Sequence, residues 1–140
     1  MTTTSKNAKT TDETTFCRIK SKKILLVEDD EIVRMVTTML LKEIGCRPDT
    51  AANGQQALEL VQKNEYDLII TDIGLPDING IHLATQILAL ERNKKTPIVA
   101  LTALAEEDTE KRCLKAGIKK VIFKPANIAT LTEIIIQFTI

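Results

Sequence analysis

The alternation of short apolar runs with stretches of helical periodicity constrains the fold of this chain more than any other feature. Four runs rich in apolar and β-branched residues are flanked by polar or turn residues, which is typical of buried strands, and a fifth, at residues 47–52, is a shorter and weaker strand. Between them, apolar residues recur three and four positions apart, as on the inner face of a helix. The expected strands are residues 22–27, 47–52, 66–72, 96–102 and 119–123, and the expected helices are residues 31–44, 53–61, 81–92, 106–115 and 128–138.

Five strands that alternate with five helices favour an α/β fold in which helices cover both faces of a parallel sheet. Crossover connections in such sheets are right-handed, which leaves few topologies. The common doubly wound arrangement for five units has the strand order 2-1-3-4-5, as in flavodoxin-like proteins. We therefore predict a five-stranded parallel sheet in which the first and third strands lie side by side.

The first expected helix carries more apolar residues than one core-facing stripe requires. Asp30 can cap its start and Gly45 can end it. The stripe expected to face the core contains Ile32, Val36, Leu40 and Ile44. The excess apolar residues indicate either wide burial or a docking patch for a helical partner, and they are Val33, Met35, Met39 and Leu41.

Polar side chains stand where the expected strands end. Glu28 and Asp29 follow the first strand, and Asp72 closes the third. Thr102 closes the fourth strand and Lys124 follows the fifth. Because open α/β sheets place their active groups at the carboxyl ends of the strands, we expect these side chains to meet at one edge. A single Asp at a strand end is usually a turn residue or a helix cap, so only the combination indicates a functional site.

Three carboxylates at one edge would repel one another. Two unit charges ~4 Å apart cost about 4 kcal/mol at an effective dielectric constant of roughly 20, so positive charge must lie among them. Lys124 can supply part of it, and a hard divalent cation with oxygen ligands can supply the rest. Mg²⁺ suits such a site because it keeps several waters and binds one or two carboxylates.

A carboxylate beside Mg²⁺, a lysine and a hydroxyl group is equipped for phosphoryl chemistry. An aspartate can act as a nucleophile and form an aspartyl phosphate. The metal and the lysine would neutralise charge on the transferring group. The pattern therefore predicts phosphoryl transfer at Asp72, with Thr102 and Lys124 beside it.

These residues resemble the receiver domain of two-component response regulators over residues 22–138. Four segments carry the resemblance, and they are Leu25-Leu26-Val27-Glu28-Asp29-Asp30, Asp72-Ile73-Gly74-Leu75-Pro76-Asp77-Ile78-Asn79-Gly80, Pro97-Ile98-Val99-Ala100-Leu101-Thr102-Ala103 and Lys124-Pro125. The Glu-Asp acid pair and the third segment are most similar to the receivers of hybrid sensor histidine kinases.

The resemblance implies that Asp72 is the phosphoacceptor and that Mg²⁺ is bound by Asp29, by Asp72 and by the backbone carbonyl of Gly74. Glu28 would be the second member of the acid pair and would reach the metal through water. The implied partner is a histidine kinase or a histidine phosphotransfer domain. Phosphorylation would switch the conformation of the domain, or the phosphate would pass on to the phosphotransfer domain.

The resemblance also implies that Thr102 and Lys124 bond the phosphoryl oxygens. In many receivers an aromatic residue three positions before the lysine reports the movement of the hydroxyl group, but here this position is Val121. We therefore expect any conformational change to travel through backbone shifts around Thr102. A receiver catalyses its own phosphorylation and dephosphorylation, and this sequence contains no Gly-rich ATP loop with which it could act as a kinase.

Three other functions are compatible with parts of the pattern. A phosphate-independent receiver-like scaffold would keep the fold without the chemistry. A flavodoxin-like protein would need a hydroxyl- and glycine-rich loop for the phosphate of FMN, where residues 28–31 are all acidic. A phosphatase of the haloacid dehalogenase type would need two aspartates separated by one residue, whereas Asp29 and Asp30 are adjacent.

Composition limits the partners and the setting. Residues 1–20 are mostly polar, so we expect a flexible N-terminal tail or interdomain linker before a receiver domain at residues 21–140. The 19 Lys and Arg residues balance the 19 Asp and Glu residues, which gives no charge excess for nucleic acid or an anionic membrane. Three widely spaced cysteines fit a reducing compartment. With no signal segment visible, we expect a cytoplasmic location.

Overall fold

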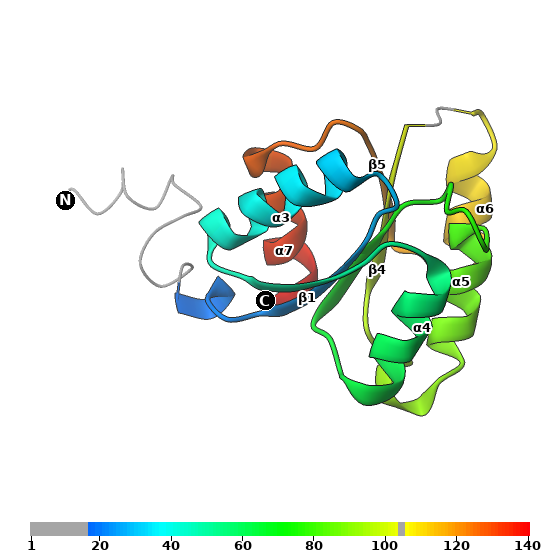
Figure 1. Ribbon diagram of the computed structural model, residues 1–140, viewed down its shortest axis with the longest axis horizontal. Helices are drawn as coiled ribbons and strands as arrows, with labels where there is room; N and C mark the ends of the chain where they lie inside the picture. Colours follow the sequence, from blue (N-terminus) through cyan, green and yellow to red (C-terminus); the bar gives the residue numbers. More distant parts are fainter. Residues whose placement is uncertain (1–16, 104–105) are drawn as a thin grey trace.

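The computed structural model describes residues 17–103 and 106–140 and confirms the predicted doubly wound α/β fold (Figure 1). The five strands in this part of the chain are parallel and pair in the order β2-β1-β3-β4-β5. They are β1 (Lys23–Val27), β2 (Arg47–Ala51), β3 (Leu68–Thr71), β4 (Ile98–Thr102) and β5 (Lys120–Phe123).

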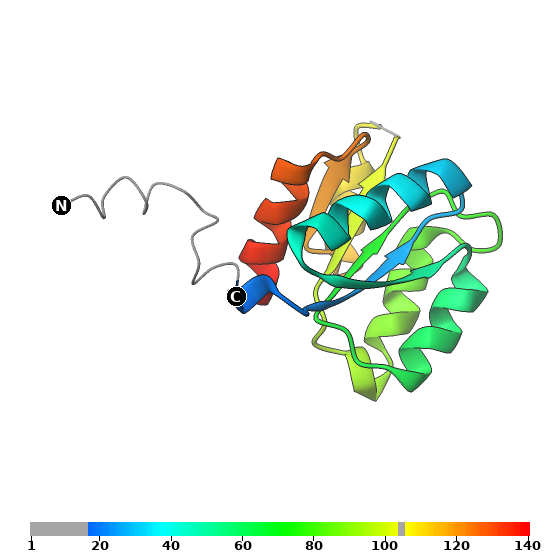
Figure 2. The ribbon, with the colours of Figure 1, turned by 60° about the vertical axis from the view of Figure 1, so that its left-hand side comes forward.

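Helices cover both faces of this sheet. α3 and α7 lie together on one face, whereas α4, α5 and α6 lie on the other (Figures 1 and 2). α6 begins later than the expected residue 106. The helices are α3 (Glu31–Ile44), α4 (Gly54–Lys63), α5 (Gly80–Leu88), α6 (Thr109–Lys115) and α7 (Ile128–Thr139), with a short 3-10 helix, η1 (Glu91–Asn93), after α5.

Alternate residues of the central strands supply two separate cores. On β1, Leu25 and Val27 belong to the core beneath α4, α5 and α6, whereas Ile24 and Leu26 belong to the core beneath α3 and α7. Each of these four side chains is at most 1% exposed. Because successive strand residues point to opposite faces, burial on both faces explains why the strand is a continuous apolar run.

The structure corrects the expected inner face of α3. Ile32 is 67% exposed and Val36 is 46% exposed, although both belong to the stripe expected to face the core. Thr37 and Leu41 are buried instead. Apolar residues surround most of this helix, so their spacing alone does not set its rotation about its axis. The outward apolar residues, here named the α3 patch, are Ile32, Met35, Val36 and Met39.

α5 ends before the expected position near residue 92, because the chain turns to place Asn93 in the core. Asn93 is fully buried. Its Nδ2 donates to the carbonyls of Val61 and Asn64, at 2.9 Å each. Its Oδ1 accepts from the backbone N–H of Tyr66 and from the hydroxyl of Thr96, at 3.0 Å each. These bonds tie the end of α4 to the starts of β3 and β4, and a continuous helix would lose them.

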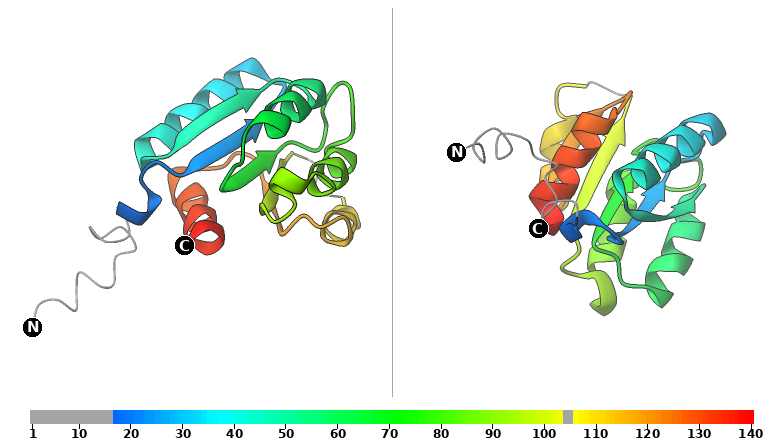
Figure 3. Two further views of the ribbon diagram at one scale, coloured as in Figure 1. Left: turned by 90° about the horizontal axis from the view of Figure 1, so that it is seen from below. Right: turned by 90° about the vertical axis from the view of Figure 1, so that its left-hand side faces the viewer.

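The packed part of the domain begins before the expected boundary at residue 20. Residues 17–19 are helical and lie beside the C-terminal end of α7 (Figures 2 and 3). Ile19 is only 2% exposed and shares a core cluster with Leu131 and Ile135 of α7. Residues 1–16 of the expected tail lie outside the described residues.

The burial of the thiols predicts selective labelling. Cys17 is exposed, whereas Cys46 and Cys113 are buried. Burial raises the pKa of the Cys46 thiol to about 11 and also raises the pKa of Cys113. Because the thiolate is the nucleophile, a disulfide reagent at about pH 8 should label only Cys17 in the native protein and all three thiols after denaturation. Intact mass measurements check this, and rapid native labelling of Cys46 would contradict the packing.

Candidate functional site

Three carboxylates meet at the carboxyl ends of β1 and β3. One oxygen from each of Glu28, Asp29 and Asp72 lies within 4.8 Å of the others. The parallel pairing of the two strands brings them together, and the N–H of Asp72 donates to the carbonyl of Val27 at 2.9 Å. Glu28 is 1% exposed and Asp72 is 7% exposed. Asp29 is exposed, so the cluster opens to solvent on the side of Asp29.

Lys124 carries its ammonium group into this cluster from the end of β5. Its Nζ lies 2.7 Å from Glu28 Oε1 and 3.1 Å from Asp72 Oδ2. The N–H of Lys124 donates to the carbonyl of Thr102 at 2.9 Å, which extends the pairing of β4 with β5 by one residue. The lysine side chain is only 18% exposed, so solvent and salt screen these contacts weakly.

Burial and charge act in opposite directions on the pKa values of this pair. Burial raises the pKa of the Glu28 carboxyl, and the neighbouring Lys124 offsets only part of that rise. Burial lowers the pKa of Lys124, but the carboxylates of Glu28 and Asp72 outweigh it and leave the pKa above that of an ordinary lysine. The lysine therefore stays charged at neutral pH and places a positive charge beside both carboxyl groups.

The loop that carries the acid pair is held in place by α3. Arg34 Nη1 donates to the carbonyl of Glu28 at 2.8 Å and lies 3.4 Å from the carbonyl of Asp29. The N–H of Asp30 donates to Glu28 Oε2 at 3.1 Å. Asp30 also caps α3, as expected, by accepting from the N–H of Val33. Arg34 is not among the residues expected from the sequence, and its place one helical turn after the cap is the signal that could have found it.

Gly74 and Thr102 lie at the same edge of the sheet. The N–H of Gly74 donates to Asp72 Oδ1 at 3.2 Å, and Gly74 is exposed. Thr102 is the last residue of β4, the neighbour of β3, and is 1% exposed. The structure thus gathers Glu28, Asp29, Asp72 and Lys124 through their side chains, Gly74 through its backbone and Thr102 through its place in the sheet.

The donor set of this cluster fits a hard divalent cation. Three carboxylates share one edge with a single lysine in contact with two of them. Glu28 Oε1 is buried, and the ammonium group of Lys124 lies 2.7 Å from it. Excess negative charge and spare oxygen acceptors are what Mg²⁺ requires of a protein site.

The sequence model of the protein family described as the response regulator receiver domain matches residues 24–136 of this chain. This chain belongs to the response regulator receiver family. It is therefore a receiver domain of two-component signalling, as the resemblance of its four segments predicts.

The receiver domain is similar to parts of longer signalling proteins. It is 37% identical to the aerobic respiration control sensor protein ArcB of Escherichia coli K12 over 116 residues, which cover 82% of this chain and 15% of ArcB. It is also 37% identical to the transcriptional regulatory protein SrrA of Staphylococcus aureus over 105 residues, which cover 75% of this chain and 42% of SrrA. The receiver domain therefore spans less than half the length of these relatives.

Solved receiver structures share its fold. The receiver domain of sensor histidine kinase PA1611 from Pseudomonas aeruginosa PAO1 has a TM-score of 0.79 and 34% identity, over 85% of this chain and 98% of that chain. That structure contains a magnesium ion coordinated in its active-site cleft. The chemotaxis protein CheY4 of Vibrio cholerae has a TM-score of 0.80 and 28% identity, over 84% of this chain and 98% of that chain.

Two further properties of the receiver domain bear on its surroundings. Within residues 17–103 and 106–140, no helix has both the length and the apolar composition needed to cross a membrane.

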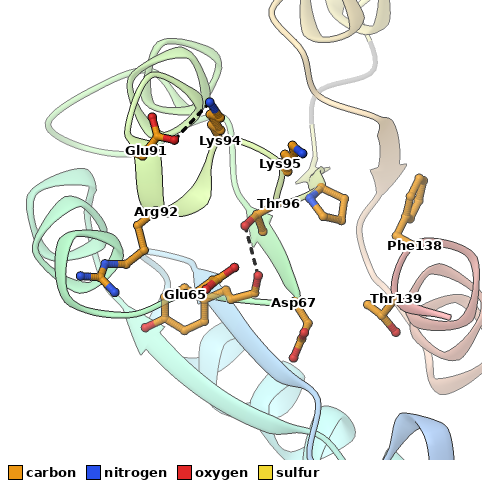
Figure 4. A pocket seen from close by; sticks show the side chains of 11 residues that line it. Glu65, Asp67, Glu91, Arg92, Lys94, Lys95, Thr96, Phe138 and Thr139 are labelled. Atoms are coloured by element: carbon orange, nitrogen blue, oxygen red, sulfur yellow. Dashed lines mark hydrogen bonds and ion pairs between the residues drawn. The ribbon is translucent and has the colours of Figure 1, made fainter.

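A cavity of about 540 Å³ lies at the amino edge of the sheet, opposite the carboxylates, between the starts of β3 and β4 and the end of α7 (Figure 4). Three acidic and three basic side chains line it, with Glu91 and Lys94 paired at 3.2 Å, so its charge favours neither anions nor cations.

Removal of Lys124 should destabilise the metal-free receiver domain. Lys124→Met leaves Glu28 and Asp72 without their cation, and breaking a buried ion pair in this way costs about 3 kcal/mol or more. Urea unfolding of both proteins without divalent cations measures the loss. Because Glu28 already has a raised pKa, its protonation in the variant should make the loss smaller at acidic pH than at pH 8. Equal stability of the two proteins at pH 8 would contradict the proposed balance of charge.

Proposed function

We propose that this receiver domain accepts a phosphoryl group on Asp72 from a phosphohistidine, with Mg²⁺ bound beside it. The contact that carries the proposal is the 3.1 Å approach of Lys124 Nζ to Asp72 Oδ2 inside a cluster of three carboxylates. In the transfer, an Asp72 oxygen attacks phosphorus, the P–N bond to the imidazole breaks, and the histidine keeps the bonding electron pair. Lys124 holds positive charge where negative charge spreads over the phosphoryl oxygens.

In this proposal, Asp29, Asp72 and the backbone carbonyl of Gly74 hold the cation, with Glu28 as the second acid. When bound, Mg²⁺ neutralises charge on the phosphoryl oxygens. Glu28 also orients the lysine, since its Oε1 lies 2.7 Å from Lys124 Nζ. Asp72 is 7% exposed, so most of its surface is covered by the protein.

Lys124 contacts Asp72 before any phosphate arrives, which limits the free energy available for a conformational switch. A hydrogen bond to a charged group contributes roughly 1.5–3 kcal/mol, and that is the most a new bond from Thr102 would add. Lys124 would add only the difference in free energy between the bonds that it makes after phosphorylation and those that it makes before. A shift in the population ratio of two conformations from 1:99 to 99:1 needs ~5.5 kcal/mol. We therefore propose that phosphorylation shifts the populations in part and that partner binding completes the shift.

The missing aromatic residue supports a switch through the backbone. Val121 is 9% exposed and belongs to the same core cluster as Ala100 of the neighbouring strand β4. A valine packed in this way offers no large side chain that could swing between the core and the surface. We therefore propose that phosphorylation is communicated by displacement of the end of β4 around Thr102.

We propose that the α3 patch docks a helical histidine-containing partner, such as a phosphotransfer domain. Its exposed fractions are 67% for Ile32, 55% for Met35 and 63% for Met39. α3 begins two residues after Asp29, so a partner seated on the patch lies beside the carboxylates. An apolar face of this kind suits a helix in a groove.

The similarity to the sensor protein ArcB supports a receiver within a hybrid kinase. Because phosphohistidine donors are made from ATP, we place the domain in the cytoplasm.

Acetyl phosphate should phosphorylate the receiver domain at Asp72. With Mg²⁺ present, intact mass spectrometry should detect one added phosphoryl group, and Asp72→Ala should show none because the nucleophile is gone. Asp30→Ala serves as a matched control, since Asp30 caps α3 but lies outside the carboxylate cluster. A wild-type protein that stays unmodified would favour the phosphate-independent scaffold instead.

A negative charge on the α3 patch should weaken partner binding. Met35→Glu should lower the affinity for a histidine phosphotransfer domain about tenfold or more, if Met35 is a central contact. Leu114→Glu is the matched control because Leu114 of α6 is also apolar, is 50% exposed and lies on the other face of the sheet. Titration calorimetry measures both affinities. Equal loss in the two variants, or no loss in Met35→Glu, would exclude the patch as the docking surface.

A further inference from the structure

The loop between Asp72 and α5 is fastened at both of its ends. The N–H of Gly80 donates to the carbonyl of Ile73 at 2.8 Å, and Gly74 forms an isolated antiparallel bridge with Asn79. A Cβ atom on Gly80 would collide with the backbone carbonyl oxygen of Asp72. The loop therefore folds back closely against the residue that ends β3.

The middle of the same loop is attached to a different helix by Asp77. Asp77 Oδ1 accepts from the N–H of Gly54 at 2.9 Å, and Asp77 Oδ2 accepts from the N–H of Gln55 at 2.9 Å. Both donors belong to the first turn of α4, where backbone N–H groups have no partner within the helix. Ile78 packs directly on Gly54, and a Cβ atom on that glycine would collide with it. We name these contacts of Asp77 and Ile78 with α4 the loop clasp.

The loop clasp joins elements that the sheet does not place together. α4 follows β2, whereas the loop follows β3, and β1 separates the two strands. The clasp spans more than 20 residues of sequence, since Gly54 and Asp77 are 23 positions apart. The bonds from Gly54 and then Gln55 hold the pKa of the Asp77 carboxyl below its usual range, so the group that accepts them is ionised at neutral pH.

Asp77 shares the capping of α4 with Asn53, but unlike Asn53 it also fastens the loop to the helix. Asn53 Oδ1 accepts from the N–H of Gln56 at 2.8 Å within the same first turn. The position of Gly74, by contrast, depends on the loop. Gly74 lies in the loop between Ile73, whose carbonyl accepts from Gly80, and Asp77, which is bonded to α4. The N–H of Gly74 donates to Asp72 Oδ1 at 3.2 Å. The backbone of the loop therefore touches the carboxylate at the centre of the site.

We propose that Asp77 is a positioning residue that, by holding the loop on α4, sets the Gly74 backbone and the Asp72 carboxylate for cation binding. The inference rests on the proposed function, since it assumes that Mg²⁺ binds at this cluster. Partners that orient metal ligands typically change metal affinity by about 10–100-fold when they are removed. Asp77→Ala should therefore weaken Mg²⁺ binding about tenfold, and Asp77→Asn, which retains one oxygen acceptor, should have an intermediate effect.

Magnesium titration of the purified receiver domain tests the clasp. Calorimetry gives the dissociation constant, and circular dichroism verifies that each variant is folded. Asn53→Ala is the matched control, because it weakens the same helix end but leaves both bonds of Asp77 in place. We expect it to lower the unfolding temperature without changing the Mg²⁺ dissociation constant. The amide resonance of Gly74 in the metal-free protein should shift in Asp77→Ala and stay in place in Asn53→Ala.

Measuring the Mg²⁺ dissociation constants at high salt distinguishes a positioning role of Asp77 from a long-range effect of its negative charge. Raising the salt concentration to about 1 M shortens the screening length to roughly 3 Å, so a long-range effect of the Asp77 charge should disappear while a positioning effect persists. An unchanged dissociation constant in Asp77→Ala, equal weakening in Asn53→Ala, or loss of the difference at high salt would each overturn the clasp. Failure of the wild-type protein itself to bind Mg²⁺ would instead overturn the proposed function.

Discussion

Negative charge crowded at the ends of β1 and β3 is the constraint on which the rest of this domain depends. The parallel pairing of these strands forces Glu28, Asp29 and Asp72 into one small volume. Glu28 is almost completely buried there, so its charge has to be met by the protein or by a bound cation. Lys124 meets part of it and, in doing so, links the last strand of the sheet to the first and the third. The same unbalanced charge is what a bound divalent cation would neutralise, so the feature that makes the cluster costly to fold also suits it to hold a metal.

The strand ends could be predicted from the sequence because each apolar run stops at a polar residue, and strand order then follows from a few topological rules. Asp72 and Lys124, more than fifty residues apart, were placed at one edge in this way. The rotation of α3 could not be obtained by the same method. Its apolar residues surround the helix, and the buried face includes Thr37, a polar residue that spacing rules assign to the surface.

Supporting contacts made through the backbone were also beyond prediction. Arg34 bonds the carbonyl of Glu28, and Asp77 bonds the N–H groups of Gly54 and Gln55. Every residue has such carbonyl and N–H groups, so the sequence does not indicate which of them a side chain will reach. The end of α5 is a similar case, because Asn93 stops the helix through bonds to segments that are distant in sequence. Long-range polar contacts of this kind set the fine geometry of the site after the apolar pattern has set the fold.

The helical residues 17–19 pack beside the C-terminal end of α7, which brings the first described residues and the C-terminus to one corner (Figures 2 and 3). This corner is at the amino edge of the sheet, whereas the carboxylates occupy the opposite edge. A neighbouring domain attached at either end would therefore be joined to this domain at the same corner. Such an attachment would leave the opposite edge of the sheet, with its carboxylates, clear of the connection.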